Sequence, residues 1–232
     1  MIQLTDLYFS YPQGDFNLRI ADLNVSDGES VAITGPSGSG KTTLLNLIAG
    51  IALPASGRIE TRGVNIASLS EADRREFRIS VIGLVFQEFE LLEYLTVLDN
   101  ILLPFRVSSA LALTREIRDR ALELADEVEI ADKLARYPDQ LSQGERQRAA
   151  VCRALITRPP LLLADEPTGN LDPANKNRVL DILFDYANRE SATLITVTHD
   201  HDLIGRFSTV IDFKQFHYSG PAEQSAEAMQ PV

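Results

Sequence analysis

One stretch decides the fold of this chain: Gly35-Pro36-Ser37-Gly38-Ser39-Gly40-Lys41-Thr42-Thr43. It fits the pattern G-x-x-x-x-G-K-[ST], in which the backbone amides of a glycine-rich loop surround phosphate groups. Glycine suits the loop because the amides must approach the anion closely, where a Cβ atom would interfere. The apolar run Val31 to Thr34 predicts a buried strand before the loop. The leucines after the loop predict a helix that stops at Gly50 and aims its N-terminal dipole at the anion.

A second segment complements this loop. Leu161-Leu162-Leu163-Ala164-Asp165-Glu166 reads as an apolar strand that ends in two carboxylates. We expect Lys41 to pair with β- and γ-phosphate oxygens, and Thr42 to ligate Mg²⁺ directly. Asp165 would hold Mg²⁺ through water, and Glu166 would face the attacking water as a general base. The two segments together predict hydrolysis of a nucleoside triphosphate.

The composition excludes several other classes of protein. The chain has 232 residues, is 44% apolar and carries a formal net charge of −11. This charge argues against a nucleic-acid partner and against a basic patch on anionic lipid. No run of 18 apolar residues is present, which predicts the absence of a membrane span. Met1 to Asp6 lacks the features of a signal peptide, so we expect a cytosolic protein. The single cysteine, Cys152, excludes a disulfide and is expected to be buried.

The apolar pattern predicts an α/β fold. Residues 1–25 alternate as antiparallel strands around the turn Tyr11-Pro12-Gln13-Gly14, and Ile79 to Phe86 has the length of a strand. Strands at 161–165, 193–198 and 209–213 alternate with helices, which is typical of a parallel sheet covered on both faces. We therefore predict a P-loop NTPase core with a mixed, mostly parallel sheet, an N-terminal antiparallel β subdomain and an inserted helical subdomain over about 88–157. One domain would span 1–218, and residues 219–232 would form a disordered tail.

A third motif indicates a family. Leu141-Ser142-Gln143-Gly144-Glu145 resembles the signature of ATP-binding cassette (ABC) ATPases, and Ser142 precedes Asp165 by 23 residues as in that family. Ser142 and Glu145 also form a capping box, which predicts that a helix begins there. The resemblance covers about residues 1–215. Its motifs appear in the family's order, namely Tyr11, the loop at 35–43, Gln87, the signature at 141–145, the strand at 161–166, Asp172 and His199.

The resemblance implies a role for each of these residues. Tyr11 would stack on adenine, although it could equally be a turn aromatic, and Tyr8 is a rival for the role. Gln87 would reach Mg²⁺ and the lytic water and would report to a membrane partner. Ser142 and Gly144 would contact the γ-phosphate of ATP bound to a second protomer.

Two further residues complete the implied site. Asp172 would cross the dimer seam and would also cap the helix that starts at Pro173. His199 would hold the γ-phosphate and orient Glu166. The signature departs from many family members at Gln143, where glycine is common. This difference affects the geometry across the two protomers and removes no catalytic group.

Within the family, Ala164 to Asp172 and Glu145 resemble the branch of lipoprotein-release, macrolide-export and cell-division ATPases. The resemblance implies a separate ATPase subunit on the cytosolic face of the inner or plasma membrane. Its partners would be ATP, a second copy of itself or a homologous ATPase subunit, and an integral membrane permease, with export of a lipoprotein, lipid or peptide cargo. The stretch Glu88 to Leu98 would receive a short helix of the permease, or would be core of the helical insertion.

Three other functions are compared with the features of the sequence. A regulatory ABC ATPase of the cell-division type would signal through a membrane partner without transport, and the sequence leaves this alternative open. A DNA-repair ATPase would carry a long coiled coil or zinc insertions, whereas 100 residues separate Lys41 from Leu141 here, without heptads or CxxC. A ribosome-associated protein would need two cassettes in one chain, and this chain has one.

Overall fold

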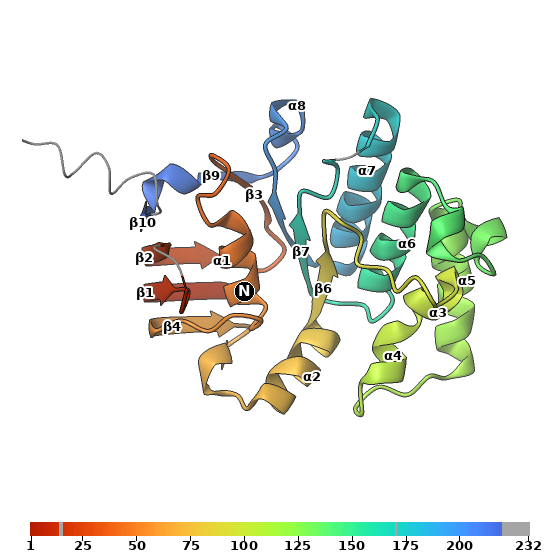
Figure 1. Ribbon diagram of the computed structural model, residues 1–232, viewed down its shortest axis with the longest axis horizontal. Helices are drawn as coiled ribbons and strands as arrows, with labels where there is room; N and C mark the ends of the chain where they lie inside the picture. Colours follow the sequence, from red (N-terminus) through yellow and green to blue (C-terminus); the bar gives the residue numbers. More distant parts are fainter. Residues whose placement is uncertain (14–15, 170, 220–232) are drawn as a thin grey trace, which may run out of the picture.

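In the computed structural model, which describes residues 1–13, 16–169 and 171–219, the strands form two sheets. The antiparallel sheet lies on the left in Figure 1, the parallel sheet in the middle and the inserted helices on the right. The strands are β1 (Ile2–Ser10), β2 (Asn17–Val25), β3 (Ser30–Thr34), β4 (Ser56–Thr61), β5 (Val64–Asn65), β6 (Ile82–Val85), β7 (Leu161–Asp165), β8 (Thr193–Val197), β9 (Thr209–Asp212) and β10 (His217–Ser219).

The antiparallel sheet has the strand order β10-β2-β1-β4-β5 and confirms the predicted N-terminal subdomain. The register between β1 and β4 shifts between Thr5 and Tyr8 of β1, where Asp6 adopts a left-handed φ of 47°. Gly57 lies against this bulge, since a Cβ atom there would approach the carbonyl oxygen of Asp6 to 2.4 Å. The predicted turn at 11–14 falls partly on residues outside the described ranges. Ser219, which was expected to begin the tail, is the last residue of β10, and residues 220–232 also lie outside the described ranges.

The central sheet has the order β6-β7-β8-β3-β9, and all of its described pairings are parallel. The antiparallel strands of the expected mixed sheet therefore form a sheet of their own. Alternate residues of β7 belong to two clusters of the core. Leu161 and Leu163 pack in the cluster that contains helix α1 (Lys41–Ile48), and Leu162 and Ala164 pack in the cluster that contains α6 (Gln143–Leu155) and α7 (Pro173–Glu190). Because both faces are covered, the strands read as continuous apolar runs.

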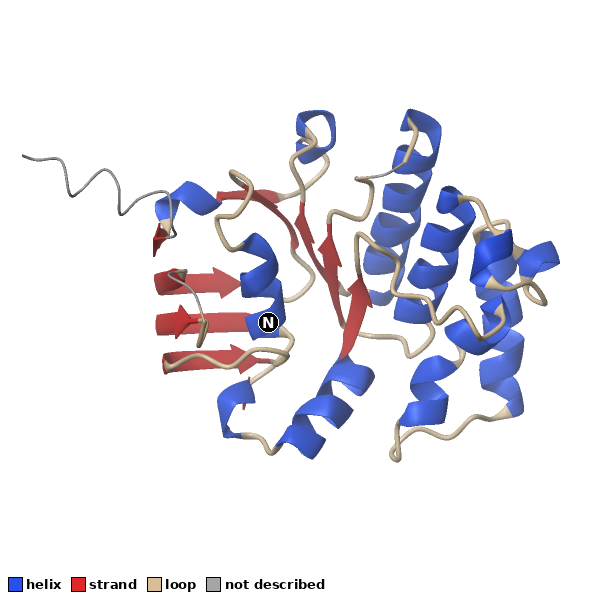
Figure 2. Cartoon of the chain, in the orientation of Figure 1, coloured by secondary structure: helices blue, strands red, loops and turns tan. Residues whose placement is uncertain are grey.

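The helices flank these sheets, as the blue ribbons of Figure 2 show. After α1 come α2 (Glu71–Val81), α3 (Val97–Ile101), α4 (Leu103–Val107), α5 (Arg115–Glu127), α6 (Gln143–Leu155), α7 (Pro173–Glu190) and α8 (His201–Ile204). Short 3₁₀ helices cover Ile66–Ser68, Ala131–Lys133, Pro138–Gln140 and Phe213–Gln215. Among the described residues, none of the helices has the length and apolar character needed to cross a membrane.

The boundary between α2 and β6 differs from the sequence-based prediction. The run from Ile79 to Phe86 was expected to be one strand, but its first three residues complete α2 and the strand begins at Ile82. The hydroxyl of Ser70 accepts a hydrogen bond from the Asp73 amide, which starts α2, and acidic residues in the first turn favour the helix dipole. The apolar run therefore belongs to two elements, and its continuity concealed the junction.

The inserted helical region was expected over about 88–157. Helices α3 to α6 lie between β6 and β7 in the sequence, and Ser142 and Glu145 form the expected capping box at the start of α6. Cys152 is buried in this region, and its Sγ lies 3.6 Å from the Leu124 carbonyl. Burial raises the pKa of its thiol, so the side chain acts as a small apolar group.

Candidate active site

A cleft of about 350 Å³ opens at the edge where the parallel strands end. Because parallel strands share one direction, the residues that follow β3 and β7 meet at this edge (Figure 1). The cleft is lined by Tyr11, Phe16, Ser37, Gly38, Gly40, Lys41, Thr42, Thr43, Gln87, Asp165, Glu166 and Val197. The structure thus brings together the two motifs that the sequence analysis paired.

The glycine-rich loop runs from β3 to α1 in a conformation that needs glycine. Gly40 caps α1 with a left-handed φ of 102°, and a Cβ atom there would lie 2.5 Å from the Phe16 ring. At Gly35, a Cβ atom would lie 2.9 Å from Cβ of Phe213. The buried hydroxyl of Ser39 has no hydrogen-bond partner among the described residues. The loop therefore has a fixed path, with the N-terminus of α1 facing the cleft.

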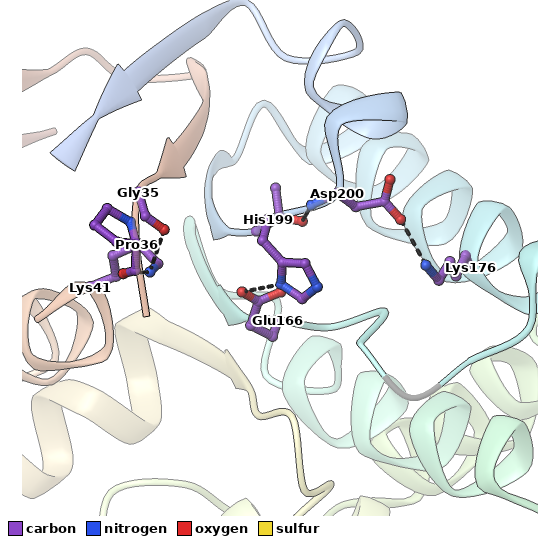
Figure 3. A network of polar contacts seen from close by, with 8 residues as sticks. Gly35, Pro36, Lys41, Glu166, Lys176, His199 and Asp200 are labelled. Carbon is purple, nitrogen blue, oxygen red and sulfur yellow. Dashed lines mark hydrogen bonds and ion pairs between the residues drawn. The ribbon is translucent and has the colours of Figure 1, made fainter. Parts of the chain in front are cut away.

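The backbone of the glycine-rich loop holds the side chain of Lys41. The ammonium Nζ donates hydrogen bonds of 2.9 Å to the Gly35 carbonyl and 2.7 Å to the Pro36 carbonyl (Figure 3). Burial lowers the pKa of Lys41, and the carboxylates of Glu166 and Asp165 act in the opposite direction. A buried cation beside the amides of the loop is a suitable receptor for phosphate oxygens.

Asp165 ends β7 beside the loop and is half-buried. Burial raises the pKa of its carboxyl group, and a hydrogen bond from the Thr42 hydroxyl partly opposes this effect. Gln87 lines the same cleft. A hydroxyl, a carboxylate and an amide oxygen form the kind of hard donor set that Mg²⁺ prefers, and a cation there would also compensate the buried carboxylate. The residues present therefore fit a magnesium ion.

Glu166 lines the cleft and faces His199, which is not among the described residues that line it. Nδ1 of His199 lies 2.8 Å from Oε1 of Glu166 (Figure 3). Glu166 has a left-handed φ of 46°, and its amide donates to the Val197 carbonyl at 3.0 Å. Its side chain is 14% exposed, whereas that of His199 is 70% exposed. Such a non-glycine conformation directs the carboxylate to one place.

Tyr11 also lies in the cleft, where the sequence analysis left two interpretations open. Its ring packs edge-on against Phe9 with centroids 4.8 Å apart, and its hydroxyl lies 3.1 Å from Oγ1 of Thr43. Tyr11 as a residue is still 42% exposed. Tyr8 is not among the described residues that line the cleft, and its ring instead meets the Arg19 guanidinium. This placement favours Tyr11 over Tyr8 as the residue near a nucleotide base.

Ser142, Gly144 and Asp172 lie outside this cleft among the residues that the structure describes. They occupy the N-termini of α6 and α7, which face the same side of the molecule as the cleft (Figure 1). Asp172 caps α7 by accepting from the amides of Ala174 and Asn175 at 3.1 Å. Hydrogen bonds, chiefly from the Asn175 side chain, lower the pKa of Asp172. The cap expected from sequence is present.

A second cavity of about 280 Å³ separates the core from the inserted helices. It is lined mainly by apolar side chains of α2, β6, α4 and α6, namely Ile79, Ile82, Leu84, Leu103, Pro104, Val107 and Ala154 with Phe86, Arg78, Arg153, Glu90 and Thr157. We refer to it as the subdomain groove. Of the stretch Glu88 to Leu98, which was expected to carry such a groove, Glu90 is the member that lines it among the described residues, and Leu91 packs on the core of the helical region.

Three supporting residues were missed in the sequence. Phe16 covers the glycine loop, Gln147 donates from α6 to the Pro167 carbonyl at 2.8 Å, and Arg153 binds the carbonyls that follow Gln87. Each acts on a segment far from it in the chain, so no local motif marks it. A glutamine and an arginine on an otherwise buried helix face were the available signal.

This fold and cleft define a P-loop nucleoside triphosphatase. The chain belongs to the ABC transporter family, because a family model described as ABC transporter matches residues 18–169. The lipoprotein-releasing system ATP-binding protein LolD of Treponema denticola is 41% identical over 203 residues, which cover 88% of this chain and 87% of that protein. The macrolide export ATP-binding/permease protein MacB of Rhodopirellula baltica is 42% identical over 217 residues, which cover 92% of this chain and 32% of that protein.

Solved structures agree with this assignment. The dimeric post-hydrolysis state of the ATP-binding cassette MJ0796, bound to ADP and Pi, has a TM-score of 0.83 and 33% identity, and the match covers 92% of this chain and 95% of that one. The predicted family, fold class and branch are confirmed. The chain is an ATP-hydrolysing cassette of the ABC type.

Proposed function

We propose that this chain is the separate ATPase subunit of a transporter of the lipoprotein-release type, acting as a dimer on a membrane permease at the cytosolic face of the inner or plasma membrane. The observation that carries the proposal is the cleft in which Lys41, Asp165, Glu166 and Gln87 converge. The match to LolD extends over most of both chains, whereas the match to MacB ends within a longer ATP-binding/permease protein.

In this proposal the residues of the cleft have separate roles in ATP binding and hydrolysis. Lys41 and the loop amides bind the β- and γ-phosphates, and Tyr11 stacks on the adenine. Thr42, Asp165 and Gln87 would hold Mg²⁺, which would neutralise phosphate charge when bound. Glu166 orients and deprotonates the attacking water.

His199 acts beside these groups. Because its Nδ1 lies within hydrogen-bond distance of Glu166, it orients that carboxylate and presents its other ring nitrogen to the γ-phosphate.

The second copy completes the site. Ser142 and Gly144 lie at the N-terminus of α6, outside their own cleft, where the helix dipole favours a phosphate. In the dimer they would face the γ-phosphate held by the partner, and Asp172 would cross the seam. ATP then favours the closed dimer, and hydrolysis releases it, which is a shift between two populations.

The subdomain groove would receive a helix of the permease. It is mostly apolar, it is open to solvent, and its wall includes Arg153, which also holds the backbone after Gln87. A helix seated there would therefore touch the segment that carries Gln87. The cargo would be a lipoprotein, lipid or peptide that the permease selects.

A pull-down tests the permease proposal. Glu166→Gln protein with Mg-ATP is used as bait on detergent-solubilised membranes, and we expect a polytopic membrane protein. Val107→Glu, on an exposed groove position, should abolish recovery, whereas Val210→Glu, equally exposed on β9, should not. A dimer that forms on ATP but recovers no membrane protein would contradict the permease proposal. Recovery of a partner that moves no cargo would indicate a regulatory ATPase of the cell-division type.

A further inference from the structure

The first turn of α7 reaches the segment that carries His199. Nζ of Lys176 lies 2.8 Å from Oδ2 of Asp200, the residue that follows His199 (Figure 3). Both side chains are partly sheltered, with 30% of Lys176 and 17% of Asp200 exposed. The ion pair therefore joins α7 to the loop after β8. It does so at the residue next to His199, whose ring contacts Glu166.

His199 needs such an anchor because its own side chain is mostly exposed. Burial does not fix the ring, so the distance to Glu166 depends on the backbone from which the ring projects. That backbone is fixed on its N-terminal side, where the Thr198 amide donates to the Ile33 carbonyl at 3.1 Å. On its C-terminal side the Asp200 amide donates to Oγ1 of Thr198 at 3.1 Å, and Lys176 holds the carboxylate.

The other end of the ion pair is also well fixed. The Lys176 amide donates to the Asp172 carbonyl at 2.9 Å, so Lys176 belongs to the first hydrogen-bonded turn after the Asp172 cap. Its neighbour Asn175 accepts from the Arg148 guanidinium at 2.9 Å, which ties the same turn to α6. One helical turn thus contacts both α6, the helix that begins at the signature motif, and the loop that carries His199.

We propose that Lys176 is a positioning residue for ATP hydrolysis, which acts through Asp200 to keep His199 in register with Glu166. The inference rests on the roles of Glu166 and His199 that are given under the proposed function. A partly exposed ion pair adds little to the stability of the fold. Its loss should therefore lower the rate of ATP hydrolysis while leaving the free energy of unfolding nearly unchanged. Binding of ATP by the glycine loop does not involve this pair.

The test compares Lys176→Met with Lys176→Arg in a steady-state ATPase assay. The methionine keeps the aliphatic stem and removes the charge, and we expect kcat to fall roughly tenfold while KM for ATP stays within about twofold. Arginine keeps the charge and should restore most of kcat. The thermal midpoints of both variants should stay close to that of the original protein.

A matched control is available on the same helix. Asp181 of α7 pairs with Arg206 at 2.7 Å, in the segment just beyond α8, so Asp181→Asn also breaks an ion pair between α7 and the chain after β8. This pair lies away from His199 in the sequence and does not line the cleft among the described residues. We expect kcat of Asp181→Asn to be unchanged. An equal loss in both variants would show a structural effect and overturn the proposal.

A double-mutant cycle identifies the route of the effect. If Lys176 acts through His199, then Lys176→Met should cost nothing further in a His199→Ala background. The same roughly tenfold loss in both backgrounds, or no loss in either, would overturn the inference. Full activity of His199→Ala itself would instead contradict the proposed role of His199. The two failures are therefore distinguishable.

Discussion

Arg153 of α6 donates a hydrogen bond of 2.7 Å to the Phe89 carbonyl and a second hydrogen bond to the Glu90 carbonyl. Phe89 and Glu90 both adopt left-handed φ values, 62° and 51°. Burial lowers the pKa of the Arg153 guanidinium to about 10, which leaves it charged at neutral pH. One side chain of α6 therefore holds a strained turn that follows Gln87 at two points.

Replacing Arg153 by leucine should release this turn. The two carbonyls lose their donor, and relaxation of the strained backbone offsets only part of this cost, so we expect a loss of about 2 kcal/mol in the free energy of unfolding. Stimulation of ATP hydrolysis by the permease should fall more than the basal rate. Denaturant unfolding and ATPase assays in proteoliposomes measure the two effects. As a control, Arg118→Leu changes an exposed arginine of α5 and should leave both unaltered.

The Glu166→Gln variant should bind ATP, form a stable dimer and lose hydrolysis by at least about a hundredfold, because the amide cannot accept the proton of water. The glutamine Oε1 can still accept a hydrogen bond from His199, so the geometry around it is retained. Size-exclusion chromatography with Mg-ATP checks the dimer, and Glu93→Gln, at an exposed position, is the matched control. Elution as a monomer at saturating ATP would contradict the two-copy site.

Lys41→Ala should weaken ATP binding by about a hundredfold, since the charge-assisted bonds to the phosphates are lost. Titration calorimetry with ATP measures this loss. Lys214→Ala, which removes an exposed lysine, should bind as before. Tight binding by Lys41→Ala would show that the loop is not the phosphate site.

The sequence predicted most of this site because each motif is local. The glycine loop, the carboxylates at the end of β7 and the capping box at Ser142 each depend on neighbours within a few residues, and the structure places all three at the ends of the expected elements. Contacts between distant segments were not predictable in this way. Phe16 lies over Gly40 because the two sheets fold together. The subdomain groove lies mainly between α2 and α4, and among the described residues of 88–98 it takes in Glu90. The junction at Ile82 was missed because the last residues of α2 and the strand that follows share one apolar run.

Asp165 supplies a test of how the site affects stability. Burial raises the pKa of its carboxyl above the usual 3.8, so between these two values the folded protein binds more protons than the unfolded chain. Stability must therefore fall as the pH rises through this window, and ionised Asp165 destabilises the fold at neutral pH. Asp165→Asn should unfold at a higher temperature than the original protein at neutral pH, and the difference should vanish as the pH falls below the window.

The effect of pH on stability has the opposite sign for Asp172. Its hydrogen bonds lower its pKa, so its stabilising effect is present above the unfolded pKa and is lost as the pH falls through the native value. Asp172→Ala should therefore unfold at a lower temperature at neutral pH, with a deficit that shrinks in acid. Differential scanning calorimetry without nucleotide measures both variants. A lower unfolding temperature for Asp165→Asn at neutral pH would mean that its bond to Thr42 outweighs burial, and that the carboxylate is stable there without a cation.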